Sequence, residues 1–274
     1  MQMNILVTLD RNYLLPLRVL LHSILTSDPR STFTLYAAHA SLTEEDFALL
    51  RTDVGLMRCT IVPIEVPAHL LEDAPTLRRL SKASYYRLIA PSYLPPEVDR
   101  ILYLDPDITV IRSLRDFYFM DLQGKYIAAA GHLDGVFRRF NCRRLRIRHN
   151  DEYFNSGVLL MDVQALRALD NNEQIFDFVR ANKRRLLLGD QDTVNMFYDG
   201  HILTVDAARY NLDERTYRRL QRRGEIDLRW VRDNAVIIHY NGKEKPWHPN
   251  YSGELGSYFF RARKGLERTI GVSV

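Results

Sequence analysis

The chain has 274 residues, of which 46% are hydrophobic and 26% charged, and its formal net charge is +4. This balance is typical of a soluble globular protein with one large or two small domains, and no stretch approaches the roughly 18 apolar residues of a membrane-spanning helix. Cys59 and Cys142 form no ligand motif and no disulfide framework, which favours reduced thiols in a cytoplasmic protein.

Short apolar runs alternate with helical patterns through the first hundred residues. The N-terminus lacks the features of a signal peptide and instead predicts a first strand at residues 3–9. Further strands are predicted at residues 33–38, 60–66 and 101–104. Helices are predicted at residues 14–26, from a capping box at 41–44 to about residue 50, and from residue 82 to 88, where Pro91 ends the helix. This alternation favours an α/β fold with a mostly parallel central sheet flanked by helices on both faces.

The second half of the chain has a less regular pattern. Strands are predicted at residues 126–130, 158–161 and 236–239, and a helix at residues 191–197. Because no repeat or linker divides the sequence, we expect one domain with its ligand site along one edge of the sheet. The Gly-rich signatures of the dinucleotide-binding and P-loop folds are absent, so any nucleotide phosphates would be held in another way.

Two carboxylates follow the strand at residues 101–104. Asp105 and Asp107 stand one residue apart, immediately after this apolar run. Strand ends deliver side chains to the rim of a sheet, where ligands bind in α/β proteins. Two buried neighbouring acids are costly without a compensating cation, and oxygen ligands suit Mg²⁺ or Mn²⁺. The alternative is a solvated turn, since Asp-x-Asp is a common sequence.

Three more segments place polar residues at the ends of predicted elements: residues 10–13, 153–160 and 189–193. The first could hydrogen-bond and stack a base, or form an ordinary turn rich in Asp and Asn. The second places an amide and a small residue just before a predicted strand, and a turn leading into that strand explains the pattern almost as well. The third places acids at a helix start, where the helix dipole favours them without any function.

A fourth segment, residues 239–248, is harder to explain as structure alone. His239 ends a predicted strand, and Gly242, Lys245 and Trp247 follow it. An imidazole can complete a metal site. Glycine allows the backbone to approach a phosphate closely, and lysine supplies a point charge for it.

Arginines concentrate in two places. Residues 137–149 carry six arginines in thirteen positions, and a second cluster comprises Arg215, Arg218, Arg219, Arg222 and Arg223. One interpretation is a surface loop and a solvated helix face. The other is attraction to an anionic acceptor or to an anionic membrane surface near segment 138–148. Nucleic acid is not expected, because no RNA-binding or helix-turn-helix motif accompanies the arginines.

Taken in order, these segments resemble glycosyltransferase family 8, the retaining GT-A-fold transferases that use UDP-sugars and include bacterial lipopolysaccharide galactosyl- and glucosyltransferases and glycogenin. The resemblance rests on Leu-Tyr-Leu-Asp-x-Asp, Phe-Asn-Ser-Gly, Asp-Gln-Asp and His-Tyr-x-Gly-x-x-Lys-Pro-Trp, and extends from the first strand to about His248. It implies a single GT-A domain over residues 1–274, with a nucleotide-binding half at 1–110, a donor-sugar and acceptor half at 111–250, and a helical tail at 251–274.

The resemblance also implies a role for each matching residue. Asp105, Asp107 and His239 would bind Mn²⁺ or Mg²⁺. The uracil and ribose would be held by Asp10, Asn12 and Tyr13. The diphosphate would be held by Lys245, by the backbone at Gly242 and by Arg87, which would reach the phosphate or the donor sugar. The sugar would be surrounded by Asp134, Asn155, Asp190 and Gln191, with Gln191 nearest its anomeric carbon. The expected partners are a UDP-hexose and a glycan or lipid-linked glycan acceptor.

The residue types favour a particular retaining mechanism. Double displacement requires a carboxylate beside the anomeric carbon, whereas the resemblance places the amide of Gln191 there. We therefore favour attack by the acceptor on the face from which UDP leaves, with the leaving phosphate accepting the acceptor's proton.

Two alternatives remain open from the sequence. Asp105-Pro106-Asp107-Ile108-Thr109-Val110 also matches the first motif of haloacid-dehalogenase-like phosphohydrolases, in which Asp105 would be a nucleophile. That nucleophile normally follows the first strand, and here about a hundred residues precede it. A sugar-nucleotide-binding protein without transferase activity is the other alternative.

Overall fold

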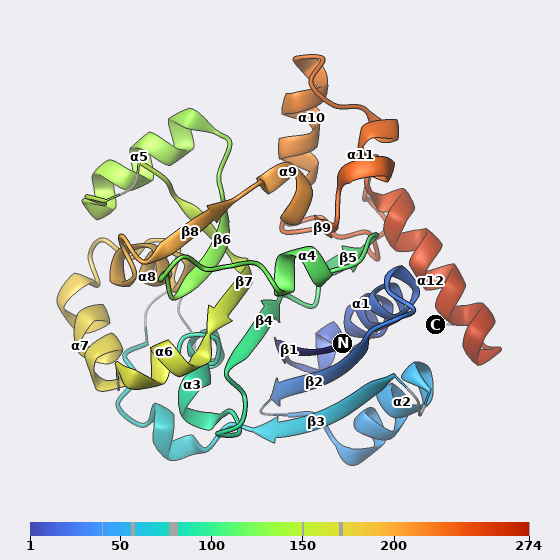
Figure 1. The fold of residues 1–274 in the computed structure, drawn as a ribbon, viewed down its shortest axis with the longest axis horizontal. Helices are drawn as coiled ribbons and strands as arrows, with labels where there is room; N and C mark the ends of the chain where they lie inside the picture. The colour runs from blue at the N-terminus through green and yellow to red at the C-terminus, as the bar shows by residue number, and fades with distance from the viewer. Residues whose placement is uncertain (40, 56–57, 77–81, 150, 170–171, 274) are drawn as a thin grey trace.

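The central sheet has seven strands in the order β3-β2-β1-β4-β7-β6-β8, and a separate two-stranded sheet pairs β5 with β9 (Figure 1). This computed structural model describes residues 1–39, 41–55, 58–76, 82–149, 151–169 and 172–273. The strands are β1 Gln2–Leu9, β2 Thr32–His39, β3 Cys59–Glu65, β4 Arg100–Leu104, β5 Ile108–Val110, β6 Ile127–Gly131, β7 Phe154–Asp162, β8 Ile202–Val205 and β9 Ile237–His239.

The sheet is mostly parallel, as predicted. Strands β1, β2, β3 and β4 pair with one another in parallel, and so do β6 and β8. Only β7 is reversed, and it runs antiparallel to both β4 and β6. The reversed strand joins the two parallel groups, so the carboxyl end of β4 meets the beginning of β7.

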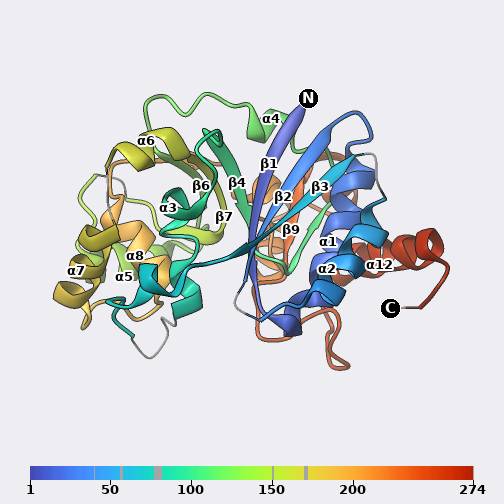
Figure 2. The same ribbon diagram turned by 90° about the horizontal axis from the view of Figure 1, so that it is seen from below.

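Helices cover both faces of the sheet. Figure 2 shows α1, α2 and α12 on one side, and α3, α6 and α7 on the other. The helices are α1 Leu14–Ser27, α2 Glu44–Val54, α3 Ala90–Tyr93, α4 Arg115–Tyr118, α5 Gly135–Leu145, α6 Val163–Ala168, α7 Asn172–Asn182, α8 Asp190–Phe197, α9 Ala207–Tyr210, α10 Glu214–Arg222, α11 Leu228–Asn234 and α12 Gly256–Ile270. Short 3₁₀ helices are η1 Arg11–Tyr13, η2 Ala68–Leu71 and η3 Lys82–Tyr85.

The hydrophobic pattern explains this layering. Along β1, Met3, Ile5 and Val7 pack in the core that contains α1 and α2, whereas Leu6 packs in the core that contains α6 and α7. A strand buried on both faces requires apolar residues at successive positions, and this run provides them. The apolar positions of α1 recur with helical spacing and face the sheet. A third apolar cluster lies under α10, α11 and α12.

Two helix boundaries differ from those predicted. The capping box of α2 is formed by Thr43 and Asp46, not by Ser41 and Glu44. Pro91 lies in the first turn of the short helix α3, where its missing N–H costs no hydrogen bond, so it does not end a helix running from residue 82. Among the described residues, none of the helices has the length and apolarity required to cross a bilayer.

Candidate active site

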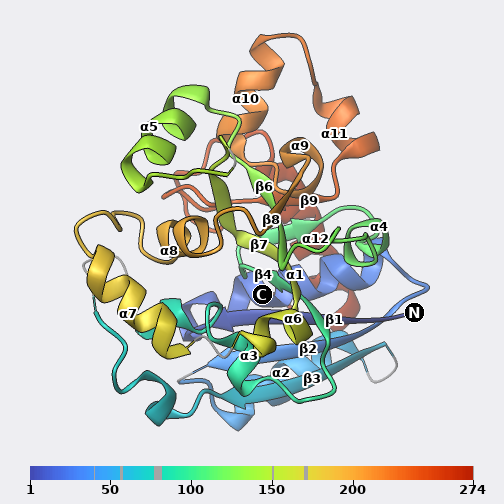
Figure 3. The same ribbon diagram turned by 60° about the vertical axis from the view of Figure 1, so that its left-hand side comes forward.

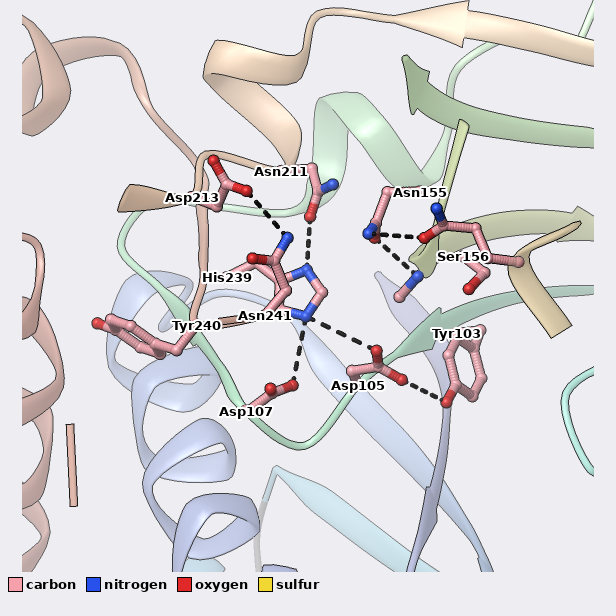
Figure 4. Close-up of polar contacts among 12 residues, drawn as sticks. Tyr103, Asp105, Asp107, Asn155, Ser156, Asn211, Asp213, His239, Tyr240 and Asn241 are labelled. Atoms are coloured by element: carbon pink, nitrogen blue, oxygen red, sulfur yellow. Dashed lines mark hydrogen bonds and ion pairs between the residues drawn. The ribbon is translucent and has the colours of Figure 1, made fainter. Parts of the chain in front are cut away.

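Three ligand-type side chains meet beyond the end of β4. One carboxylate oxygen each of Asp105 and Asp107 and one imidazole nitrogen of His239 all lie within 4.8 Å of one another. The Nε2 atom of His239 is 3.6 Å from Asp105 Oδ2 and 3.3 Å from Asp107 Oδ1 (Figure 4). His239 is 2% exposed, so the cluster lies at the inner wall of the site and not on the surface.

The small sheet explains why residues far apart in the sequence meet here. Asp107 immediately precedes β5, and β5 pairs antiparallel with β9 in a register that sets Ile108 opposite His239. The next backbone hydrogen bond continues the ladder, from the amide of Tyr240 to the carbonyl oxygen of Asp107. The register of these two short strands therefore fixes the imidazole beside the second carboxylate.

Asn211 fixes the orientation of the imidazole. Its amide oxygen lies 2.8 Å from Nδ1 of His239, and because this oxygen only accepts, Nδ1 carries the proton. Nε2 faces the two carboxylates; burial lowers the pKa of His239, but the charges of Asp107 and Asp105 raise it above its ordinary value, so a cation at Nε2, either a proton or a metal ion, is favoured. Nε2 is buried and has no hydrogen-bond partner among the described residues. Two carboxylates and an available imidazole nitrogen fit Mn²⁺ or Mg²⁺.

Gly157 allows the cluster to pack against the sheet. A Cβ atom at this position would lie 2.4 Å from Asp105 Oδ2 and 2.4 Å from His239 Cε1, so no side chain fits. The carbonyl oxygen of Gly157 also accepts a 2.8 Å hydrogen bond from the amide of Asp105. Residues 154–157 belong to β7 itself, so the prediction of a turn ahead of a strand at 158 was wrong.

Arg87 connects the cluster to the start of α8. Its guanidinium lies 3.0 Å from Asp105 Oδ1 and 3.2 Å from Asp190 Oδ2, and it stacks 4.5 Å from the ring centroid of Tyr103. Burial raises the pKa of Asp190, an effect that Arg87 opposes. Arg87 thus occupies a position between the metal-type ligands and the residues at which α8 begins.

Lys245 approaches the cluster from the loop after β9. Its ammonium group donates to Asp107 Oδ2 and, over 2.7 Å, to the carbonyl oxygen of Tyr240. Burial alone would raise the pKa of Asp107, but His239 and Lys245 lower that pKa to about 2. The second carboxylate is therefore ionised over the whole physiological range.

Two cavities meet at this cluster. The smaller, of about 290 Å³, is lined by Asp10, Tyr13, Arg87, Asp105 and Asp107, among others. The larger, of about 850 Å³, is lined by Asp134, Asn155, Gln191, His239 and Gly242, among others. The structure thus separates the residues expected to bind the nucleotide from most of those expected to surround the sugar, with the metal-type ligands between them.

The remaining predicted residues lie near these cavities but outside their walls. Asn12 is exposed on η1, and its backbone N–H donates to Asp10 Oδ1. Asp190 contacts Arg87, and its carboxylate accepts a 3.1 Å hydrogen bond from Ser156 Oγ. Lys245 contacts Asp107. Each of these three residues therefore contacts a residue that lines the smaller cavity.

Amide side chains form the wall of the larger cavity next to His239. The Nδ2 atom of Asn155 donates over 3.3 Å to Oε1 of Gln191, and the Nε2 atom of Gln191 lies 3.3 Å from Nε2 of His132. Asn155 Oδ1 accepts from the amide of Gly157 over 2.8 Å. These bonds hold Gln191 at the cavity wall as a neutral group.

Two other predicted site residues, Asp134 and Gly242, line the larger cavity in different surroundings. Asp134 is the N-cap of α5, accepting from the amides of Val136 and Phe137, and its carboxylate also pairs with Arg219 of α10. That arginine, together with the cap hydrogen bonds, lowers the pKa of Asp134. At Gly242, an added Cβ would meet only the carbonyl oxygen of Glu244, at 3.9 Å, so packing alone does not require glycine there.

The arginine-rich segment 138–148 is mostly helical, so the prediction of a loop was wrong: residues 135–145 form α5. Arg138 pairs with Glu152 at 2.9 Å, and Arg144 pairs with the fully buried Asp192 at 2.8 Å. The exposed arginines of the segment are Arg139, Arg143, Arg146 and Arg148. The arginines that line the larger cavity belong instead to the second cluster, on α10.

Comparisons with known proteins agree with this arrangement. A family model described as glycosyl transferase family 8 matches residues 4–250. The chain is 28% identical to glycosyltransferase GlyF of Streptococcus pneumoniae, aligning over 90% of this chain and 58% of GlyF. It is 26% identical to a lipopolysaccharide 1,2-glucosyltransferase of Escherichia coli, over 92% of this chain and 75% of that protein.

A solved structure has the same fold. The galactosyltransferase LgtC, in complex with donor and acceptor sugar analogues, superposes with a TM-score of 0.80 at 25% identity and covers 95% of both chains. The GT-A fold expected from the sequence is therefore confirmed. Since the family model extends over nearly the whole sequence, this chain belongs to glycosyl transferase family 8.

Proposed function

We propose that this protein is a metal-dependent, retaining hexosyltransferase that moves galactose or glucose from a UDP-sugar to a glycan or lipid-linked glycan. The observation that carries the proposal is the cluster of Asp105, Asp107 and His239 between two cavities, with Nε2 of His239 buried, facing both carboxylates and without a hydrogen-bond partner among the described residues. The names of two relatives support it, because both are lipopolysaccharide transferases, one for glucose and one for galactose.

Asp105, Asp107 and His239 would hold Mn²⁺ or Mg²⁺. A bound divalent ion stabilises the negative charge that develops on a departing diphosphate. Lys245 would exchange its contact with Asp107 for a phosphate oxygen, because its ammonium already lies at the edge of the cluster. Arg87 and the backbone at Gly242 would complete the diphosphate site.

The smaller cavity suits the nucleoside. Asp10 and Tyr13 line its wall, and Asn12 lies next to them on η1. A carboxylate and an amide can hydrogen-bond uracil and ribose, and a phenol ring can stack on the base. The donor sugar would enter the larger cavity, whose lining includes Asn155, Gln191 and Asp134, and Asp190 would act through its contact with Arg87.

The position of Gln191 supports same-face transfer. The residue lining the cavity is a neutral amide, and the adjacent carboxylate of Asp190 is engaged by Arg87 and Ser156. An amide is a poor nucleophile, so a glycosyl-enzyme intermediate at Gln191 is not favoured. A solved active-site variant of LgtC replaces glutamine by glutamate, which supports placing a glutamine at the reacting centre of this family member too.

The exposed arginines of α5 support peripheral contact with an anionic membrane surface, which we place on the cytoplasmic face. Arg139 and Arg143 have no ion-pair partner among the described residues, so their charge is available to lipid headgroups. Replacing both with serine should reduce binding to anionic liposomes, and unchanged binding would remove this part of the proposal.

The function is tested by incubating the protein with Mn²⁺ and a panel of UDP-, GDP- and ADP-hexoses, and measuring release of the nucleoside diphosphate. We expect UDP release from UDP-galactose or UDP-glucose and none from the other nucleotides. Turnover of a generic phosphomonoester instead would favour the phosphohydrolase alternative. Binding of a UDP-sugar with no turnover, even with a range of glycan acceptors, would favour a non-catalytic binding protein.

A further inference from the structure

Helix α10 and its C-cap residue form one wall of the larger cavity, with four arginines from the helix and one from the cap. The cavity lining includes Arg215, Arg218, Arg219, Arg222 and Arg223, together with His239 and Gln191. Positions 215, 219 and 222 follow the spacing of a single helix face, which extends over about 10 Å at about 1.5 Å per residue. The opposite face of α10 is apolar, since Tyr217 and Leu220 are buried. The arginines are therefore directed to the cavity side by the packing of the helix.

Most carboxylates that line this cavity already form hydrogen bonds or ion pairs with groups other than Arg215 and Arg222. Asp134 caps α5 and pairs with Arg219, linking the two helices that stand next to each other in Figures 1 and 3. Asp213 caps α10 and accepts from Asn241. Glu214 accepts from the amides of residues 254 and 255 and from Arg218. Glu244 also lines the cavity, on the exposed loop after β9.

Two arginines of this wall remain available. Within the described part of the chain, neither Arg215 nor Arg222 has an ion-pair partner at 4.0 Å or less. Both are exposed and line the same cavity as Gln191. Free guanidinium groups at the mouth of a cavity attract anions, and their planar donors match the oxygens of a phosphate.

We propose that the acceptor of this enzyme carries a phosphate group and that Arg215 and Arg222 bind it. The inference rests on the proposed transferase function, in which the acceptor enters the larger cavity to reach the donor sugar beside Gln191. The phosphate of the acceptor then lies against α10 while a hydroxyl group reaches inward. The donor diphosphate has its own cations, Lys245 and Arg87, next to Asp107 and Asp105 on the other side of the cluster.

The test uses the protein saturated with Mn²⁺ and UDP, so that the diphosphate site is filled. Glucose 6-phosphate is titrated as the probe and followed by ligand-observed NMR, with glucose and glucuronic acid as the neutral and carboxylate comparisons. The variant is Arg215→Ser with Arg222→Ser. The matched control is Arg139→Ser with Arg143→Ser, which removes two exposed arginines of α5 that do not line the cavity.

We expect saturable binding of glucose 6-phosphate and much weaker binding of glucose and glucuronic acid. The α10 variant should bind the phosphate probe at least about tenfold more weakly, as loss of a charge-assisted hydrogen bond implies. The control should bind it as the unchanged protein does, and UDP affinity should be the same in all three proteins. Each of these results supports the proposal.

The proposal is overturned if glucose 6-phosphate shows no saturable binding at millimolar concentration, if the α10 variant binds it unchanged, or if glucuronic acid binds equally well. It is also overturned if the α10 variant loses UDP affinity, since the arginines would then serve the donor. The proposal is likewise overturned if the α10 variant loses binding only to anionic vesicles, because the two arginines would then contact a membrane surface. Failure of the unchanged protein to bind UDP would instead contradict the proposed function, and the two failures are therefore distinguishable.

Discussion

Asn211 holds the imidazole of His239 through a 2.8 Å contact between its amide oxygen and Nδ1, so that Nε2 faces Asp105 and Asp107 (Figure 4). The pairing follows from the fold, because Leu212 bridges to Ile238 of β9 and thereby sets Asn211 next to His239. A histidine ligand in proteins is usually oriented by such an outer hydrogen bond. The asparagine therefore belongs to the candidate metal site, because it orients one of the three side chains that could hold the ion.

Replacing Asn211 with alanine should weaken Mn²⁺ binding by about 10- to 100-fold, because the imidazole loses the partner that fixes its tautomer and ring angle. Calorimetric titration of Mn²⁺ in the presence of UDP measures this. Asn234→Ala is the matched control, since the side chain of Asn234, the last residue of α11, donates to the carbonyl oxygen of Trp230 in the same helix. Equal Mn²⁺ affinity in the Asn211 variant and the control would show that Asn211 does not orient the imidazole for metal binding.

Gly157→Ala should abolish metal binding and destabilise the protein. A methyl group would lie 2.4 Å from both Asp105 Oδ2 and His239 Cε1, so the ligands or β7 must move. Overpacking of this kind costs about 1–3 kcal/mol. Gly135→Ala is the control, because the nearest atom to its added Cβ is Arg139 Nη1 at 3.8 Å. If Gly157→Ala binds Mn²⁺ normally, the close packing at Gly157 does not constrain Asp105 and His239.

Lys245→Ala should weaken UDP far more than uridine, by about tenfold or more, because the lysine is assigned to the diphosphate. Tyr13→Ala should weaken both ligands by a similar factor, because its ring is assigned to the base. Lys243→Ala, two residues away on the same loop and exposed, controls for a general loss of positive charge. Equal losses of UDP and uridine in the Lys245 variant would show that this lysine does not contact the diphosphate.

Arg144→Ser should destabilise the fold by about 3–5 kcal/mol, because it leaves Asp192 as an unpaired buried carboxylate. Both oxygens of Asp192 accept from Arg144 at 2.8 Å, and Tyr153 donates to the same carboxylate over 2.6 Å. Arg143→Ser, an exposed neighbour, should change the free energy of unfolding by no more than about 0.5 kcal/mol. Urea denaturation followed by circular dichroism compares the two variants. Similar free energies of unfolding would show that the pair of Arg144 and Asp192 does not stabilise the fold.

Seven of the nine strands in the described residues, and the two carboxylates, were predictable because local sequence determines them, whereas the short strands β5 and β8 were missed. The apolar run before Asp105 is a buried strand that ends in acids, and no distant residue is needed to recognise it. The helix cap at Thr43 was missed by two positions because Ser41 and Thr43 both begin plausible capping patterns.

The tertiary parts of the site could not be predicted. Asn211 meets His239 only because an isolated bridge joins Leu212 to Ile238. Gly157 was visible as a motif residue, but its steric role depends on the register of β4 against β7, which brings Asp105 over it. Likewise, both arginine clusters were visible in the sequence. Only the structure shows that the cavity is lined by arginines of α10 and not by those of segment 138–148.

The central claim is that the cluster of Asp105, Asp107 and His239 makes nucleotide binding metal-dependent. Calorimetric titration of UDP with Mn²⁺ present, and again after EDTA treatment, tests it most directly, with Asp107→Asn as the matched variant. We expect tight binding only with Mn²⁺, a loss of at least about tenfold in EDTA, and little effect of Mn²⁺ on the variant while its circular dichroism spectrum is unchanged. Undiminished affinity for UDP in EDTA would contradict the metal site and with it the proposed mechanism.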